Sequence, residues 1–328
     1  MPVRPASLPT WLLALVAPAA AAPCQGAVPA ADAAAAATPT GCGRCHPAVH
    51  DEWQGSAHAR AFVDPLFQRA LASRQRRDWC LPCHVPDRVL DRLGQMPRAR
   101  ADRHAAGVDC ASCHLRGEAV HGPNGDTGQA APHPTVADPA FGKAGSTGLC
   151  ASCHDMRIAD VLPLAREFRA AGLRQEGESC VGCHMEPVRR APAVDPASGA
   201  PVGAERGGRN HRLLGPGDPE FCATAFVLTT DRGPDGPELR LRSGAGHGVP
   251  GLARLRAFPV RVHLLDRAGD VLHRTEFTIS WHDRLLVDED RRVALPRLDG
   301  AVALRVQVDH VFAGNAPVPV LDRTLELP

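Results

Sequence analysis

The sequence predicts an α+β protein in which a mainly helical and irregular N-terminal domain is followed by a small antiparallel β-sandwich. Two observations lead to this prediction. A cysteine pair followed directly by histidine occurs five times before residue 185 and not after it. After residue 214, short segments alternate apolar and polar residues, which is the period of half-buried strands. We therefore expect a leader at residues 1–30, a linker at 31–40, the N-terminal domain at 41–214 and the sandwich at 215–328.

The first 30 residues have the features of a cleaved export signal. Arg4 is their only charged residue, residues 11–16 form a short apolar run, and small residues follow. This run is too short to span a bilayer, and no later apolar segment reaches the roughly 18 residues that a spanning helix needs. Cys24 could accept a lipid anchor, but Pro23 directly before it fits that processing poorly. We therefore expect a periplasmic or otherwise exported protein without a transmembrane helix, and peripheral membrane association stays open.

The five cysteine motifs all read C-x-x-C-H, which is the signature of covalent c-type haem attachment. The two thiols can each bond one vinyl group of the same porphyrin, and the next residue then places an imidazole under the iron as its proximal ligand. Zinc ribbons also use cysteine pairs, but zinc does not explain a histidine after every pair. We therefore expect five haem c groups on these fifteen residues: Cys42, Cys45 and His46; Cys80, Cys83 and His84; Cys110, Cys113 and His114; Cys150, Cys153 and His154; Cys180, Cys183 and His184.

The chain between the motifs is short, because successive first cysteines are 38, 30, 40 and 30 residues apart. Five haems in so little chain must pack against one another, with helices and loops around them. Apolar residues at helical spacing predict helices within residues 56–74, with a break at Pro65, and within 155–171. Residues 123–146 are rich in glycine and proline and predict an irregular loop. Aromatic content is 4% with no tyrosine, so we expect haem to supply much of the apolar surface of this domain.

The sixth iron ligand is the open question of the N-terminal domain. Sixteen histidines include five in the motifs, which leaves eleven for five distal positions. Methionine is the alternative ligand, but the chain has only four, and Met156 and Met185 are too close to motif histidines to fold back over the same iron. We therefore expect mostly bis-histidine iron. Position in the chain makes His121 and His133 candidates, and His50 and His104 are their rivals.

The region after residue 214 predicts about six strands in a small antiparallel sandwich. Apolar and polar residues alternate at 260–264, 277–281 and 302–308, and residues 264–272 have the pattern of a hairpin. The remaining histidines of this region, among them His263 and His310, are more typical of structural roles. Cys222 is expected to be a buried free thiol.

Several short segments are shared with a known family: His46-Pro47 with Glu52-Trp53 and Ser56-Ala57-His58-Ala59, Gly107-Val108-Asp109-Cys110, Cys183-His184-Met185, Asn210-His211-Arg212, and Gly246-His247-Gly248-Val249-Pro250. With these segments the chain resembles the cytochrome c554-type family of exported multihaem c-type cytochromes. One departure is Gly251, which directly follows Pro250 where the family usually has Thr-Gly. The resemblance implies that His58, His211 and His247 are distal iron ligands, beside the candidates His121 and His133.

Two classes of function compete for such a chain. The first is an electron carrier that works between redox protein partners, and the second is a reductase or oxidase of a small nitrogen or sulfur compound at one open haem. The formal net charge of +1 argues against nucleic acid as a partner. Related nitrite reductases typically use a C-x-x-C-K motif and a tyrosine, and hydroxylamine-oxidising relatives cross-link a tyrosine to haem. This chain has neither feature, so we expect an electron carrier rather than an enzyme.

Overall fold

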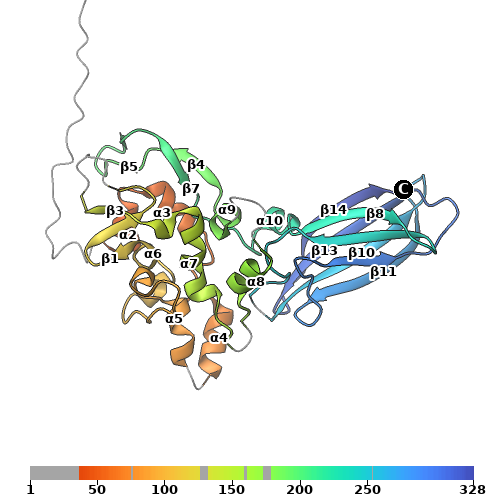
Figure 1. The fold of residues 1–328 in the computed structure, drawn as a ribbon, viewed down its shortest axis with the longest axis horizontal. Helices are drawn as coiled ribbons and strands as arrows, with labels where there is room; N and C mark the ends of the chain where they lie inside the picture. Colours follow the sequence, from red (N-terminus) through yellow and green to blue (C-terminus); the bar gives the residue numbers. More distant parts are fainter. Residues whose placement is uncertain (1–36, 75–76, 126–131, 159–160, 173–178, 253) are drawn as a thin grey trace, which may run out of the picture.

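The structure, a computed structural model, describes residues 37–328 except 75–76, 126–131, 159–160, 173–178 and 253. The predicted export signal, Cys24 and most of the predicted linker therefore lie outside the described residues. The described chain is elongated, with the motif-bearing part at one end and a pair of β-sheets at the other (Figure 1). Within the described residues, no helix is long and apolar enough to cross a membrane.

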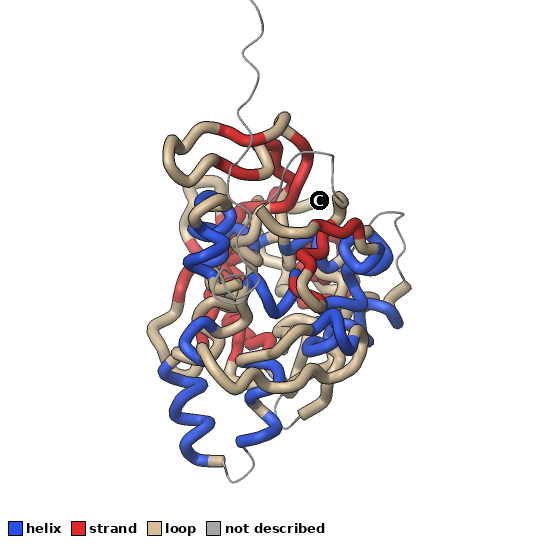
Figure 2. Tube along the Cα trace, turned by 90° about the vertical axis from the view of Figure 1, so that its left-hand side faces the viewer, coloured by secondary structure: helices blue, strands red, loops and turns tan. Residues whose placement is uncertain are grey.

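The motif-bearing part consists of short helices joined by long loops, as Figure 2 shows from that end of the molecule. Its α-helices are α2 (Pro39–Gly43), α3 (Pro47–Gln54), α4 (Pro65–Ser73), α5 (Leu81–His84), α6 (Cys110–His114), α7 (Lys143–His154), α8 (Leu164–Ala170) and α9 (Cys180–His184). Short 3-10 helices are η1 (Arg77–Trp79), η2 (Val89–Arg92), η3 (His104–Ala106) and η4 (Pro139–Phe141). Helices this short cannot bury a core by themselves and depend on what they pack against.

Two of the predicted helices are shorter than the periodicity indicated. The helix expected within residues 56–74 begins only at Pro65, because the Asp64 carboxylate caps it by accepting from the Leu66 and Phe67 amides at 2.9 and 3.0 Å. The helix expected within residues 155–171 is α8 alone, and Pro163 precedes it. In both cases proline at the start of the helix sets the boundary.

Small sheets fill part of the loop regions. β1 (Leu115–Arg116), β2 (Ala119–Gly122) and β3 (Thr135–Ala137) form one sheet, in which β2 and β3 are parallel. β4 (Pro187–Arg190) pairs with β7 (Arg206–Arg209), and β5 (Ala193–Val194) pairs with β6 (Pro201–Val202). The predicted irregular loop at 123–146 thus contains β3, η4 and the start of α7, although residues 126–131 are not described.

The C-terminal part is built from two antiparallel sheets that share one apolar core. After α10 (Pro219–Ala223), one sheet has the order β11-β10-β13-β14 and the other β12-β9-β8. The strands are β8 (Phe226–Arg232), β9 (Pro237–Ser243), β10 (Arg256–Leu265), β11 (Val271–Ser280), β12 (Asp290–Ala294), β13 (Ala303–Phe312) and β14 (Val318–Glu326). The three alternating segments of the sequence lie in β10, β11 and β13, and β10 and β11 form the expected hairpin.

The large apolar core lies only in this part of the described chain. Its buried members fall between Phe226 and Leu321, and alternate residues of β10 such as Val260 and Val262 contribute to it with 1% or less of their surface exposed. At about 25 cal/mol for each Å² of apolar surface, such burial is sufficient to hold the two sheets together. The described residues of the motif-bearing part instead surround a cavity.

Candidate haem-binding site

One cavity of about 2850 Å³ runs through the motif-bearing part and reaches the sheets. A pocket for one ligand has roughly 300–1,000 Å³, so this cavity has room for several large groups. Its walls include all ten motif cysteines and all five motif histidines. The residues that the sequence predicts as attachment points therefore converge on one shared space.

Four motifs lie on or at the start of a helix, and the first spans the end of α2 and the turn after it, which brings the reactive groups of each motif to one face. Residues three apart on a helix are neighbours, so both sulfurs of a pair point to the same side. The third and fifth motifs are capped: Asp109 accepts from the Ser112 amide at 2.9 Å, and the Ser179 hydroxyl accepts from the Gly182 amide at 3.0 Å. Each cap stabilises a helix of only five residues, and so fixes the motif that it begins.

Four motif histidines have their Nδ1 atom bonded to a backbone carbonyl. A carbonyl can only accept, so Nδ1 carries the proton and Nε2 keeps its lone pair free for a metal. The pairs are His46 with Pro192 at 2.8 Å, His84 with Ala61 at 2.5 Å, His114 with His121 at 2.7 Å, and His184 with Leu214 at 2.6 Å. This is the arrangement in which protein histidines usually bind metals.

Four motif histidines also lie close to a second histidine. The ring centroids are 6.1–6.5 Å apart in the pairs His46–His133, His154–His58, His114–His211 and His184–His247. A metal–imidazole bond is about 2 Å and the ring centre lies about 1 Å beyond the nitrogen, so two imidazoles on one metal have centroids about 6 Å apart. The spacing of all four pairs therefore fits bis-histidine iron.

Burial keeps several of these rings neutral. It lowers the pKa of His58 to about 4, of His154 to about 3 and of His211 to about 4, so each has a free lone pair at neutral pH. In addition, Nδ1 of His58 is buried and has no hydrogen-bond partner in the described residues. An unpartnered buried nitrogen is costly unless a group binds nearby. The cavity, the donor set and this nitrogen all fit haem.

His121 does not belong to these pairs, although the sequence made it a candidate ligand. Its Nδ1 lies 2.9 Å from the Asp138 carboxylate, and its carbonyl accepts from His114. The pairing of β2 with β1 and β3 fixes this orientation. His121 therefore holds a proximal histidine in place. Of the two rivals, His50 packs against Trp53, and His104 bonds the Arg100 carbonyl and contacts Phe62.

The second motif differs from the other four. The His84 ring stacks on Phe67 with centroids 3.6 Å apart and planes 9° apart. All sixteen histidines lie in the described part of the chain, yet none of them shows the paired spacing with His84. Among the described residues, therefore, no histidine pair marks a distal ligand for this motif.

His58 and His211 are held in place by residues of α3, a role that the sequence motifs do not predict. The Trp53 indole donates to the Val108 carbonyl at 2.8 Å, and the Val108 amide donates to the His58 carbonyl at 2.9 Å. The neighbouring Glu52 carboxylate accepts from the His211 amide and from Arg190, both at 2.9 Å. The sequence shows Glu52-Trp53 as a segment shared with a known family, but it does not predict the contacts of these two residues, because those contacts depend on tertiary structure.

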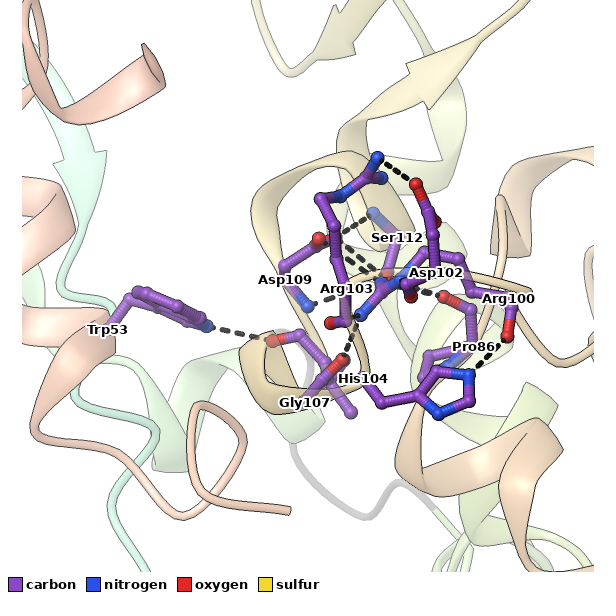
Figure 3. Close-up of polar contacts among 10 residues, drawn as sticks. Trp53, Pro86, Arg100, Asp102, Arg103, His104, Gly107, Asp109 and Ser112 are labelled. Atoms are coloured by element: carbon purple, nitrogen blue, oxygen red, sulfur yellow. Dashed lines mark hydrogen bonds and ion pairs between the residues drawn. The ribbon is translucent and has the colours of Figure 1, made fainter. Parts of the chain in front are cut away.

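A buried ion pair lies beside this network (Figure 3). Arg100 and Asp109 are 6% and 2% exposed, and Arg100 Nη1 lies 3.1 Å from Asp109 Oδ2. Arg100 also donates to the Gly107 and Pro86 carbonyls at 2.8 and 3.1 Å and to the Ser112 hydroxyl at 3.0 Å. The guanidinium thus fixes residues 107–112, which lead into and begin the third motif and contact His58. Nothing in the local sequence singles out Arg100.

The sulfurs of different motifs lie next to one another. The thiol of Cys42 lies beside that of Cys110, Cys83 beside Cys153 and Cys150 beside Cys180. These contacts link the first motif to the third, the second to the fourth and the fourth to the fifth. Cys222, which lies outside the motifs, is 7% exposed as expected, and burial raises the pKa of its thiol to about 11.

Comparison with known proteins supports the interpretation of the cavity. Residues 41–115, which hold the first three motifs, match the family described as cytochrome c554 and c-prime. The crystal structure of a penta-haem cytochrome c552 from Thermochromatium tepidum is similar, with a TM-score of 0.60 and 18% sequence identity over 88% of this chain and 97% of that chain. No curated protein matches the sequence.

At 18% identity the structural likeness shows a shared fold, and the family match concerns the motif-bearing segment. The five motifs and the penta-haem neighbour both support five haems per chain. The resemblance predicted from the motifs is confirmed for the segment that carries them: residues 41–115 match the cytochrome c554 family, and this match supports covalently bound haem c as the cofactor.

Proposed function

We propose that this chain is an exported electron carrier that passes electrons between protein partners through five haems, most of them ligated by two histidines. The observation that carries the proposal is the set of four histidine pairs with centroids 6.1–6.5 Å apart. Iron held by two imidazoles has no position left for a substrate, and it suits low-potential electron transfer. When bound, haem c supplies one-electron iron chemistry.

The described residues are arranged to hold iron in one geometry. The backbone carbonyls of Pro192, His121 and Leu214 fix the tautomer of three proximal histidines. Such partners also orient the ring and raise the basicity of the ligand nitrogen. Burial of His58 and His154 excludes water from both sides of the fourth site. These are the properties of a rigid redox site rather than of a site that exchanges ligands.

The contacts between sulfurs suggest the order of the electron path. They connect the first motif with the third, and the second and fifth motifs with the fourth. Cys113 of the third motif also lies near Cys150 and Cys153 of the fourth. We therefore infer a path from the first through the third to the fourth motif, where it divides toward the second and the fifth.

One observation favours a second candidate function. His84 stacks on Phe67 and has no paired histidine in the described part of the chain. An open haem at the second motif would be the place for a reductase or oxidase of a small nitrogen or sulfur compound. The absence of tyrosine and of a C-x-x-C-K motif weighs against this alternative.

Electron paramagnetic resonance of the oxidised holoprotein, with the haem count verified by intact mass, tests the proposal. We expect four low-spin centres, and His211→Ala should convert one of them to high spin. His263→Ala, in β10 and outside the cavity lining, is the matched control and should leave all four low-spin. Nitrite and hydroxylamine are then added with a reduced dye as the donor. A high-spin centre that binds either compound and turns it over steadily would support the reductase instead.

A further inference from the structure

The two ends of the molecule are joined by a bidentate ion pair. Glu167 lies on α8 in the motif-bearing part, and Arg284 follows β11 in the sheet part. Nη1 and Nη2 of Arg284 donate to Oε1 and Oε2 of Glu167, each at 2.8 Å. The Arg284 side chain is only 12% exposed and the Glu167 side chain only 25% exposed. Parallel charge-assisted bonds of this kind are strong and fix the relative orientation of both groups.

The same pair also holds the loop that carries His247. The Glu167 carboxylate accepts from the Gly248 amide at 3.1 Å, and Arg284 donates to the Gly248 and Pro250 carbonyls at 2.9 and 3.0 Å. The Gly248 carbonyl also lies 3.1 Å from Nδ1 of His247. The Gly248 carbonyl therefore accepts hydrogen bonds from both Arg284 and the His247 imidazole. The Glu167–Arg284 ion pair, called the clamp below, thus fixes both the loop and the tautomer of the His247 ring.

Glycine is required where the clamp meets the loop. A Cβ on Gly248 would lie 2.5 Å from Nη2 of Arg284. The guanidinium therefore packs directly on the backbone next to His247. Across the cavity, the His247 and His184 rings are nearly parallel, at 7°, with centroids 6.3 Å apart.

We propose that Glu167 and Arg284 are positioning residues that hold His247 against the iron of the fifth motif, so that docking of the sheets onto α8 sets the ligation of that haem. The inference rests on the proposed function, because it requires His247 to be a distal ligand. His247 belongs to the sheet part, so its loop must be ordered against the motif-bearing part before the ring can bind iron. Because the clamp holds this loop in place in advance, it removes most of the free-energy cost of that ordering. Outer partners of this type typically change metal affinity about 10–100-fold when they are removed.

The test is carbon monoxide binding to the reduced holoprotein, together with electron paramagnetic resonance of the oxidised form. Arg284→Gln keeps a polar side chain but loses the bidentate pair. In this variant we expect one haem more than in the wild type to bind carbon monoxide, and we expect the affinity of that haem for carbon monoxide to be about tenfold or more above its wild-type value. The oxidised variant should also show a new, partial high-spin signal. Arg305→Gln is the matched control, since Arg305 also makes a bidentate pair, with Asp322, on the exposed face of the sheets. It should bind carbon monoxide as the wild type does.

His247→Ala separates failure of this inference from failure of the proposed function. If His247→Ala leaves every haem as in the wild type, His247 is not a ligand and the proposed ligation fails. If His247→Ala makes one haem high-spin and able to bind carbon monoxide, while Arg284→Gln matches the wild type in both measurements, His247 is a ligand but the clamp does not position it, and the inference is refuted. Should Arg284→Gln not give folded holoprotein, Glu167→Gln removes the charge from the α8 side and is judged by the same two outcomes.

Discussion

Replacement of Gly107 by alanine should weaken both the fold and one iron site. Gly107 has φ 59° and ψ −133°, a region that is open almost only to glycine. It follows η3 and lies next to the buried ion pair in Figure 3. A Cβ at this position would lie 2.3 Å from the His58 carbonyl oxygen and 2.7 Å from that of Ala59. These are backbone atoms, so the contact cannot be relieved by turning a side chain.

The expected loss combines two costs. Backbone in such a region costs a residue with a side chain about 1–3 kcal/mol. The contact also pushes away the His58 carbonyl, which accepts from the Val108 amide at 2.9 Å, and a lost hydrogen bond of this kind costs about 1 kcal/mol. We therefore expect Gly107→Ala to lower the free energy of unfolding by about 2–4 kcal/mol. Because His58 moves with its carbonyl, its distance to His154 should change as well.

Gly117→Ala provides the matched control. Gly117 also has a positive φ, 58°, but no heavy atom lies within 4 Å of its Cβ position. Denaturant unfolding of both holoproteins, followed by circular dichroism, should show a smaller loss for the control by about 1 kcal/mol or more. Electron paramagnetic resonance should show a perturbed low-spin centre only in Gly107→Ala. Equal losses and an unchanged spectrum would refute the reasoning.

Three further predictions concern separate contacts. Asp109→Asn leaves Arg100 buried without its counter-charge and should cost about 3–5 kcal/mol in denaturant unfolding; a loss below about 1 kcal/mol would contradict the role of this pair. His133→Ala should add one high-spin haem at the first motif with all haems still attached by intact mass, and an unchanged spectrum would exclude His133 as its ligand. Hydrogen bonds from Arg305 lower the pKa of Asp322 to about 2 from an ordinary 3.8, so their stabilisation is complete above pH 4 and is lost as pH falls toward 2. Asp322→Asn should therefore be less stable than the wild type by about 0.5 kcal/mol at pH 7, since the pair is largely exposed, with a difference that shrinks below pH 4; a difference that is constant with pH would contradict this origin.

The features that the sequence predicted best are those set by local rules. Covalent attachment needs two thiols and an imidazole at fixed spacing, so the motifs could be recognised without any knowledge of the fold. The alternation in β10 could be recognised for a similar reason, because a strand with one face in a core repeats every two residues. Of the helical pattern over 56–74, only the part after the predicted break at Pro65 forms a helix, because the Asp64 cap and the proline set its start there.

Distal ligands could not be derived from local rules. His121 looked suitable because it lies seven residues after His114, but its ring shows no paired spacing with a motif histidine and its Nδ1 lies 2.9 Å from the carboxylate of Asp138, seventeen residues further along the chain. His58 lies by His154 of the fourth motif and not by His46, the motif histidine that is nearest to it in the sequence. Which histidine meets which haem is decided by long-range packing, and spacing along the chain carries little of that information.

The proposed iron bonds would also cross-link the chain in the part that lacks an apolar core of its own. The four histidine pairs span 87, 96, 97 and 63 residues for His46–His133, His58–His154, His114–His211 and His184–His247. In the chain-entropy description of cross-links, closing loops of such length removes about 4 kcal/mol of unfolded-state entropy for each bond. Metal binding of this kind is folding free energy, because the unfolded chain does not hold the pairs together. In the proposed holoprotein, the short helices around the cavity would thus be held by the same bonds that carry the electrons, whereas the sheets are held by their own core.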